Sequence, residues 1–132
     1  MKKLKLVGVV LAILVVAGYV VTSVAPKPMS ADLSVIGQGK PSLVLGYENY
    51  SPGGGDALTR LKQIRSDYES RLNFIVADLG TPSGRTFANR YQVVDGQAVL
   101  LAANGQLLGT LFVPANELQL RAYLDQKLAG AK

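Results

Sequence analysis

A stretch of twenty residues without a charge, residues 6–25, constrains this chain more than any other feature. As an α-helix it would be about 30 Å long, which matches the hydrocarbon core of a bilayer. A single segment in hydrocarbon must satisfy its own backbone polar groups, so a helix is the only form open to it there. Lys2, Lys3 and Lys5 precede the stretch, and a positive flank is retained in the cytoplasm. The pattern predicts a transmembrane anchor with the rest of the chain on the outer side.

Two other interpretations of this segment stay open. A cleaved signal peptide has an apolar region of about 7 to 15 residues, and Pro26 directly after the small-x-small sequence at 23–25 disfavours cleavage. A buried helix of a soluble protein would leave the lysine flank and the proline stop unexplained. We expect an uncleaved anchor within residues 1–25 that contacts lipid through residues 6–25. The expected location is a bacterial inner membrane, with the C-terminal domain in the periplasm.

The composition excludes several kinds of chemistry. The 132 residues include no cysteine and no histidine, which removes disulfides, thiol nucleophiles, ordinary zinc sites and a histidine base. The net charge is +5, but four lysines and one aspartate in residues 1–32 supply +3 of it. The other ten basic and eight acidic residues form no stripe that would follow phosphates. We expect no nucleic-acid binding, no cofactor and no enzymatic activity.

The chain after the anchor divides into a tether, residues 26–39, and one domain, residues 40–132. Within the tether, residues 33–36 have the pattern of a short edge strand. In the domain, apolar periodicity predicts strands at 42–47, 72–79, 97–102 and 106–113, and helices at 57–71, 82–91 and 117–129. Asp56, Thr81 and Asn116 are the expected N-caps, and Asn104-Gly105 is a strong hairpin signal. This order predicts an α/β fold with a mixed central sheet and helices on both faces.

The order of elements over residues 40–129 resembles the thioredoxin-like fold. Gly39-Lys40-Pro41 before a buried strand, the turn at residues 103–106 and the final helix NELQLRAYLDQKL strengthen the likeness. The resemblance aligns Ser51 and Gly54 with the two cysteines of the family, with Pro52 and Gly53 between them, and Tyr47 and Tyr50 with its two tryptophans. It aligns Gln97 with the cis-proline and Leu45 with the buried carboxylate. All of these groups are replaced, so the resemblance implies a redox-inactive relative.

A glycine-rich loop beside a tyrosine is the best candidate for a binding site. Aromatic side chains near such a loop favour contact with a protein or peptide, because they bury a large area at little cost in rotamer entropy. The partner-binding residues that we expect are Tyr50, Ser51, Pro52, Gly53, Gly54 and Gln97. Tyr47 is expected to pack in the core instead.

Other roles for these residues and their neighbours are less favoured. The loop has no phosphate-loop spacing and carries Asp56, which would oppose an anion. A catalytic Ser51 would lack a histidine base. Asp78 is expected to be a cap or turn residue, and the spacing of Glu48, Asp56 and Asp78 does not establish a cation site.

The leading hypothesis is a single-pass membrane protein that displays a redox-inactive thioredoxin-like module for protein binding, as a scaffold, a chaperone-like module or a subunit of an envelope complex. Its partner would be a protein of the periplasm or the inner membrane. One alternative is an accessory component of a thiol-disulfide exchange pathway. Another is an assembly factor that works through its transmembrane helix, where Gly8 and Ala12 form a weak small-xxx-small pattern.

Overall fold

The computed structural model describes residues 28–130, so the predicted anchor at residues 6–25 lies outside the described part of the chain. Within residues 28–130, no helix combines the length and the apolar character that crossing a bilayer requires. The core is a four-stranded sheet with the order β2-β1-β3-β4. Its strands are β1 (Ser42–Tyr47), β2 (Asn73–Asp78), β3 (Gln97–Leu101) and β4 (Leu107–Phe112). β1 pairs parallel with β2 and antiparallel with β3, and β3 pairs antiparallel with β4.

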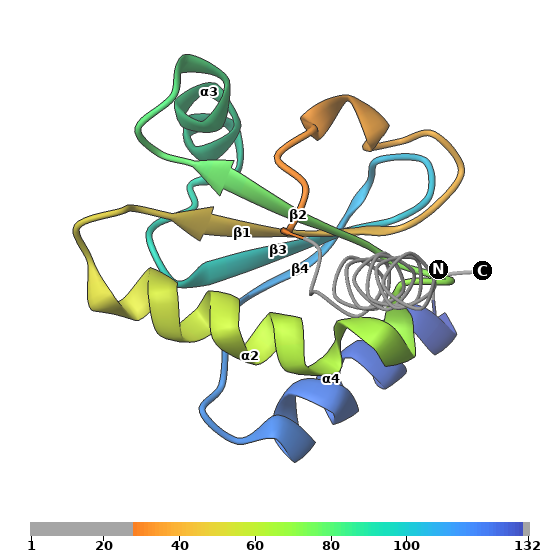
Figure 1. Cartoon of the computed structure of the whole chain (residues 1–132). Helices are drawn as coiled ribbons and strands as arrows, with labels where there is room; N and C mark the ends of the chain where they lie inside the picture. Colours follow the sequence, from red (N-terminus) through yellow and green to blue (C-terminus); the bar gives the residue numbers. More distant parts are fainter. Residues whose placement is uncertain (1–27, 131–132) are drawn as a thin grey trace, which may run out of the picture.

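Helices cover both faces of the sheet (Figure 1). They are the short 3-10 helix η1 (Leu33–Val35), α2 (Pro52–Tyr68), α3 (Pro82–Tyr91) and α4 (Glu117–Gly130). Figure 1 shows α2 and α4 on one face and α3 with η1 on the other. Alternate side chains of β1 divide between the two layers: Leu43 and Leu45 pack with the α2–α4 side, whereas Val44 packs with the α3 side. All three are fully buried, as expected for a central strand.

Most of the predicted elements are confirmed. Thr81 caps α3 by accepting a hydrogen bond from the Gly84 N–H at 3.1 Å, and the side chain of Asn116 accepts one from the Leu118 N–H at 2.8 Å at the start of α4. β3 and β4 form the predicted antiparallel hairpin, with Gly105 in its turn at φ +89°. The mixed sheet between two helical layers is therefore the fold that the apolar pattern predicted.

The edge strand predicted at residues 33–36 is wrong, because this segment forms η1 instead. The Asp32 side chain accepts a hydrogen bond from the Ser34 N–H at 3.0 Å, which turns the chain into a short helix. Ser30, just before this segment, makes an isolated parallel bridge with Ile75 at the sheet edge. A local side-chain hydrogen bond thus decided the conformation against the strand preference of the apolar residues.

The predicted start of the first long helix is also wrong. α2 begins at Pro52 with Ser51 as its N-cap, so Asp56 lies inside the helix and does not cap it. Three consecutive glycines indicate a break in a sequence. Here they form the first turn of the helix, because Pro52 occupies a position where its fixed φ suits a helix start, and because a distant carboxylate binds one of the free N–H groups.

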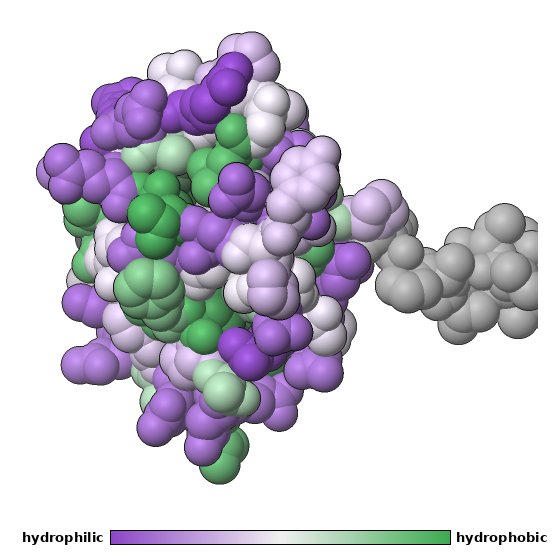
Figure 2. Space-filling view, turned by 90° about the vertical axis from the view of Figure 1, so that its left-hand side faces the viewer, coloured by the Kyte–Doolittle hydropathy of each residue, from purple (hydrophilic) through white to green (hydrophobic). Residues whose placement is uncertain are grey.

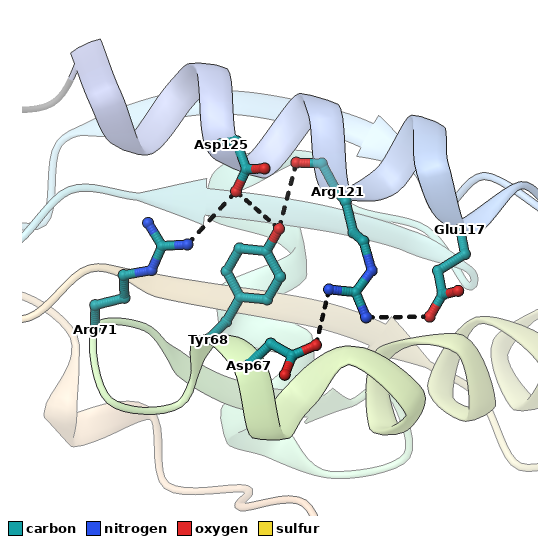
Figure 3. Close-up of polar contacts among 6 residues, drawn as sticks. All are labelled: Asp67, Tyr68, Arg71, Glu117, Arg121 and Asp125. Atoms are coloured by element: carbon teal, nitrogen blue, oxygen red, sulfur yellow. Dashed lines mark hydrogen bonds and ion pairs between the residues drawn. The ribbon is translucent and has the colours of Figure 1, made fainter.

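A polar network joins α2 to α4 (Figure 3). The Tyr68 hydroxyl donates a hydrogen bond to Asp125 at 2.8 Å, while the Arg121 guanidinium pairs with Asp67 at 2.8 Å and with Glu117 at 3.3 Å. Burial, the hydrogen bond to Asp125 and the negative charge of that carboxylate raise the pKa of Tyr68. The network joins the C-terminal part of α2 to α4, whereas the glycine-rich loop lies at the N-terminal end of α2.

Candidate functional site

The topology gathers the candidate residues at one end of the sheet. β1 and β4 end there, and β3 and α2 begin there, so the loop at residues 48–54 lies beside the turn at residues 94–97. We call this the loop end of the domain. Figure 2 faces it and shows apolar surface among hydrophilic side chains.

The turn at residues 94–97 is rigidly built. The Gln97 N–H donates to the Val94 carbonyl at 3.1 Å, and the Gln97 side-chain oxygen accepts from the Val94 N–H at 3.2 Å. Gly96 has a φ of +81°, which a type II turn requires at its third position. The Gly96 N–H also donates to the Gly46 carbonyl at 2.9 Å, which ties the turn to β1. Asp95 is therefore held in a defined position next to the glycine-rich loop.

The Asp95 carboxylate joins this turn to the glycine-rich loop. One of its oxygens accepts a hydrogen bond from the Glu48 N–H at 2.8 Å, and the other accepts one from the Gly54 N–H at 2.9 Å. The Ser51 side chain makes no capping hydrogen bond, so Asp95 does the work that an N-cap normally does for α2. A carboxylate in this place also interacts favourably with the positive end of the helix dipole.

Two glycines make room for this arrangement. A Cβ added at Gly46 would lie 2.6 Å from the Val94 carbonyl oxygen, and one added at Gly54 would overlap the Asp95 carboxylate and reach within 2.9 Å of its Cγ. Gly55 differs, because a Cβ there would have no neighbour within 4 Å. The glycine run thus contains one position that packing requires and one that packing does not.

The predicted partner-binding residues lie together at the loop end, but in different roles. Tyr50 is 96% exposed and projects from the loop, whereas Tyr47 is half-buried and its ring lies 3.2 Å from a Cβ built at Gly54. Ser51 and Pro52 begin α2. The Gln97 side chain is turned back onto Val94, and no cis peptide bond occurs among the described residues. Gln97 therefore shapes the turn.

Exposed apolar side chains surround the two loops. Among residues 28–130, five large hydrophobic side chains are strongly exposed: Tyr50, Val94, Leu107, Phe112 and Leu118. Three of them, Tyr50, Val94 and Phe112, come from segments at the loop end, whereas Leu118 lies in the first turn of α4 and Leu107 lies at the opposite end of β4. We call Tyr50, Val94 and Phe112 the apolar rim. Exposed apolar groups that gather in one place are typical of interaction surfaces, whereas scattered ones are ordinary.

In the described part of the chain, the other candidate sites show no arrangement that indicates binding or catalysis. Asp78 is a turn residue as predicted, since its carboxylate accepts from the Gly80 N–H at 2.8 Å. Within residues 28–130, no group of three or more acidic side chains is arranged to hold a metal ion. A shallow hollow between η1 and α3 is lined mainly by apolar and aromatic side chains such as Leu33, Phe87 and Tyr91, with Arg90 at its edge.

Sequence reasoning missed Asp95, the residue that organises the site. Its signal is an Asp-Gly pair between two apolar runs, which marks a turn. That signal says where the chain reverses, but it does not say which distant N–H groups the carboxylate will bind. The contact partners are 47 and 41 residues away along the chain.

The comparisons with known proteins show the fold. No protein-family model matches the chain, and no curated protein matches its sequence. Among solved structures, a thioredoxin from Thermus thermophilus is similar with a TM-score of 0.64 and 20% identity, over 76% of this chain and 86% of the other. An uncharacterised thioredoxin-like protein from Clostridium perfringens is similar with a TM-score of 0.64 and 15% identity, over 74% and 79%. The germline-specific thioredoxin Deadhead from Drosophila melanogaster gives 0.56 and 18%, over 68% and 83%.

The chain thus has a thioredoxin-like fold without a cysteine anywhere in its sequence. Thiol chemistry is absent from it. Leu45, the residue that the resemblance aligned with a buried carboxylate, is fully buried in the α2–α4 layer. The site is a pair of loops locked together by a carboxylate and bordered by apolar side chains.

Proposed function

We propose that this protein is a redox-inactive, membrane-anchored module that binds a segment of another protein at its loop end and is not an enzyme. It would serve as a scaffold, a chaperone-like module or a subunit of an envelope complex. The observation that carries the proposal is the apolar rim, since three of the five strongly exposed large hydrophobic side chains of residues 28–130 belong to segments at the loop end. Aromatic side chains are enriched among the residues that dominate binding energy.

The position of Pro28 favours a protein partner over the lipid surface. Pro28 lines a hollow together with Lys40 and Leu72, which lie at the end of the sheet opposite the loop end. A tether that leaves the domain there would turn the loop end away from the predicted anchor at residues 6–25. The apolar rim would then face the periplasm or other membrane proteins, and not the lipid surface.

Site-specific photocrosslinking in cells tests the proposal with the full chain. A photoreactive amino acid replaces Val94 at the rim, and in a matched control it replaces Leu107, which is exposed to a similar extent at the opposite end. We expect a discrete adduct from position 94 and none of that size from position 107. Adding Tyr50→Ala and Phe112→Ala should reduce the adduct at least tenfold, as expected for residues at the centre of an interface. Equal adducts from both positions, or no adduct from either, would contradict the proposal.

The likeness to thioredoxins favours one second candidate, an accessory role in a thiol-disulfide exchange pathway. With no thiol, the chain itself should not accelerate insulin reduction by dithiothreitol. Identification of the crosslinked partner as a thiol oxidoreductase would favour this candidate over a general scaffold. An assembly role of the transmembrane helix is tested separately, by replacing residues 6–25 with an unrelated apolar helix and measuring whether the adduct persists.

A further inference from the structure

We propose that Asp95 is a positioning residue that holds the glycine-rich loop, and with it Tyr50, in the conformation that binds the partner. The proposal rests on the proposed function and adds to it the residue that sets the shape of the site. A second part concerns sterics: position 54 must be glycine because the Asp95 carboxylate occupies the space of any side chain there.

The two hydrogen bonds of Asp95 fix both ends of the segment that carries Tyr50. The Glu48 N–H lies two residues before Tyr50 and the Gly54 N–H lies four residues after it, and each binds a different oxygen of the same carboxylate. Hydrogen bonds to an ionised acceptor are about twice as strong as neutral ones. The Ser51 N–H adds a turn bond to the Glu48 carbonyl at 3.2 Å. Tyr50 is 96% exposed, so the backbone of the loop sets where its ring projects from the domain.

The steric part follows from the closeness of the two chains. The Gly54 N–H donates to one Asp95 oxygen, while a Cβ on Gly54 would overlap the other. Gly54 therefore cannot gain a side chain unless Asp95 turns away and releases both N–H groups. In the resemblance, Gly54 aligns with the second cysteine of the family, so in this chain a carboxylate fills the place of the second thiol.

A double-mutant cycle tests the steric part in the purified full chain. The variants are Gly54→Ala, Asp95→Ala and the double variant, with Gly55→Ala as the matched control. Alanine is the better helix former, so Gly55→Ala should keep or raise Tm by a few degrees. Gly54→Ala should lower Tm in the wild-type background, and should lower it much less or not at all in the Asp95→Ala background, where only the Tyr47 ring stays close to the added Cβ. An equal fall in both backgrounds, or a Gly54→Ala variant that behaves like Gly55→Ala, would overturn this part.

Amide hydrogen exchange reports the hold on the loop directly. In Asp95→Ala the amides of Glu48 and Gly54 should exchange at least tenfold faster, while those of β1 and β3 keep their rates. Asp95→Asn keeps the size of the side chain but offers one acceptor oxygen. The exchange rates of the Glu48 and Gly54 amides in this variant should therefore fall between those of the wild type and those of Asp95→Ala. If the amides of Glu48 and Gly54 keep their wild-type exchange rates in Asp95→Ala, the carboxylate does not hold the loop and the positioning role is refuted.

Photocrosslinking links the loop to binding. For this experiment the photoreactive amino acid replaces Phe112, because position 94 is next to the mutated Asp95. Asp95→Ala should then reduce the partner adduct at least fivefold. An unchanged adduct from a variant whose loop amides are released would overturn the positioning role and leave the proposed function intact. Absence of any adduct in the wild type would refute the proposed function and this role together, whereas the double-mutant cycle would still decide the steric part.

Discussion

The molecule ties distant segments together in two places, and it does so by different means. At the loop end, one carboxylate binds two backbone N–H groups that belong to different segments. Between α2 and α4, side chains bind side chains: Tyr68 binds Asp125, and Arg121 binds Asp67 and Glu117 (Figure 3). The contact at the loop end requires glycine at position 54, beside the carboxylate. The contact between the helices requires a hydroxyl or a guanidinium on one helix opposite a carboxylate on the other.

Because of this difference, we expect substitutions to destabilise the loop end more than the helix network. The carboxylate of Asp95 is half-buried and anchored to backbone, so its geometry cannot relax without moving a loop. In the helix network the partner carboxylates Asp67, Glu117 and Asp125 are more than half exposed, so water replaces a lost partner. Four predictions follow this contrast from the largest effect to the smallest.

Replacing Gly46 with alanine should have the largest effect. The added Cβ would lie 2.6 Å from the Val94 carbonyl oxygen and 2.7 Å from a methyl carbon of Val93, so backbone must move. We expect the free energy of unfolding to fall by about 3 kcal/mol, the upper end of the usual cost of overpacking. Urea titration followed by circular dichroism measures it, with Gly55→Ala as control. An unchanged midpoint would show that the turn yields freely.

Replacing Tyr68 with phenylalanine should have a smaller effect. The variant keeps the buried ring, which is 2% exposed, and loses the 2.8 Å hydrogen bond to Asp125. A loss of about 1 kcal/mol is expected for such a bond. Urea titration measures the loss in the wild type and in an Asp125→Ala background, where it should largely disappear. An equal loss in both backgrounds would contradict the assigned partner.

The same tyrosine should give the domain an alkaline limit. The pKa of Tyr68 is raised by burial and by Asp125, and burial also raises the pKa of Tyr123. The folded state therefore favours the neutral phenols, and their contribution to stability is complete below the ordinary pKa of 10.0 and is lost as the pH rises above it. Thermal unfolding between pH 9 and about 11 should show a fall in Tm that is shallower in Tyr68→Phe. An identical slope in the variant would assign the fall to other groups.

Replacing Arg121 with alanine should have the smallest effect. The ion pairs of Arg121 with Asp67 and Glu117 are solvent-exposed, and exposed pairs contribute little. We expect Tm to fall by about 2 °C at low salt and by less at about 1 M salt, because counterions screen such pairs. Asp95→Ala should lose as much stability at high salt as at low salt. A salt-independent loss in Arg121→Ala would remove this distinction between the two regions.

Apolar periodicity predicted most of the fold. The strand Ser42–Tyr47 and the hairpin after Gln97 were predictable because short, continuous apolar runs and the Asn104-Gly105 turn are local signals. The segment Leu33–Val35 was not, since the hydrogen bond from the Ser34 N–H to Asp32 outweighs strand preference there. The start of α2 at Pro52 was missed because its first turn depends on a residue 41 positions away.

By itself, then, the sequence determined the α/β architecture with helices on both faces of a mixed sheet, the loss of thiol chemistry and the position of the glycine-rich loop. These follow from periodicity and composition, which are properties of neighbouring residues. Only the tertiary structure decided that Asp95 caps α2, that Gly54 rather than Gly55 is required, and that three exposed apolar side chains gather at one end. Such features depend on how strands pair and where helices cross, and those contacts form between residues that the chain order keeps far apart.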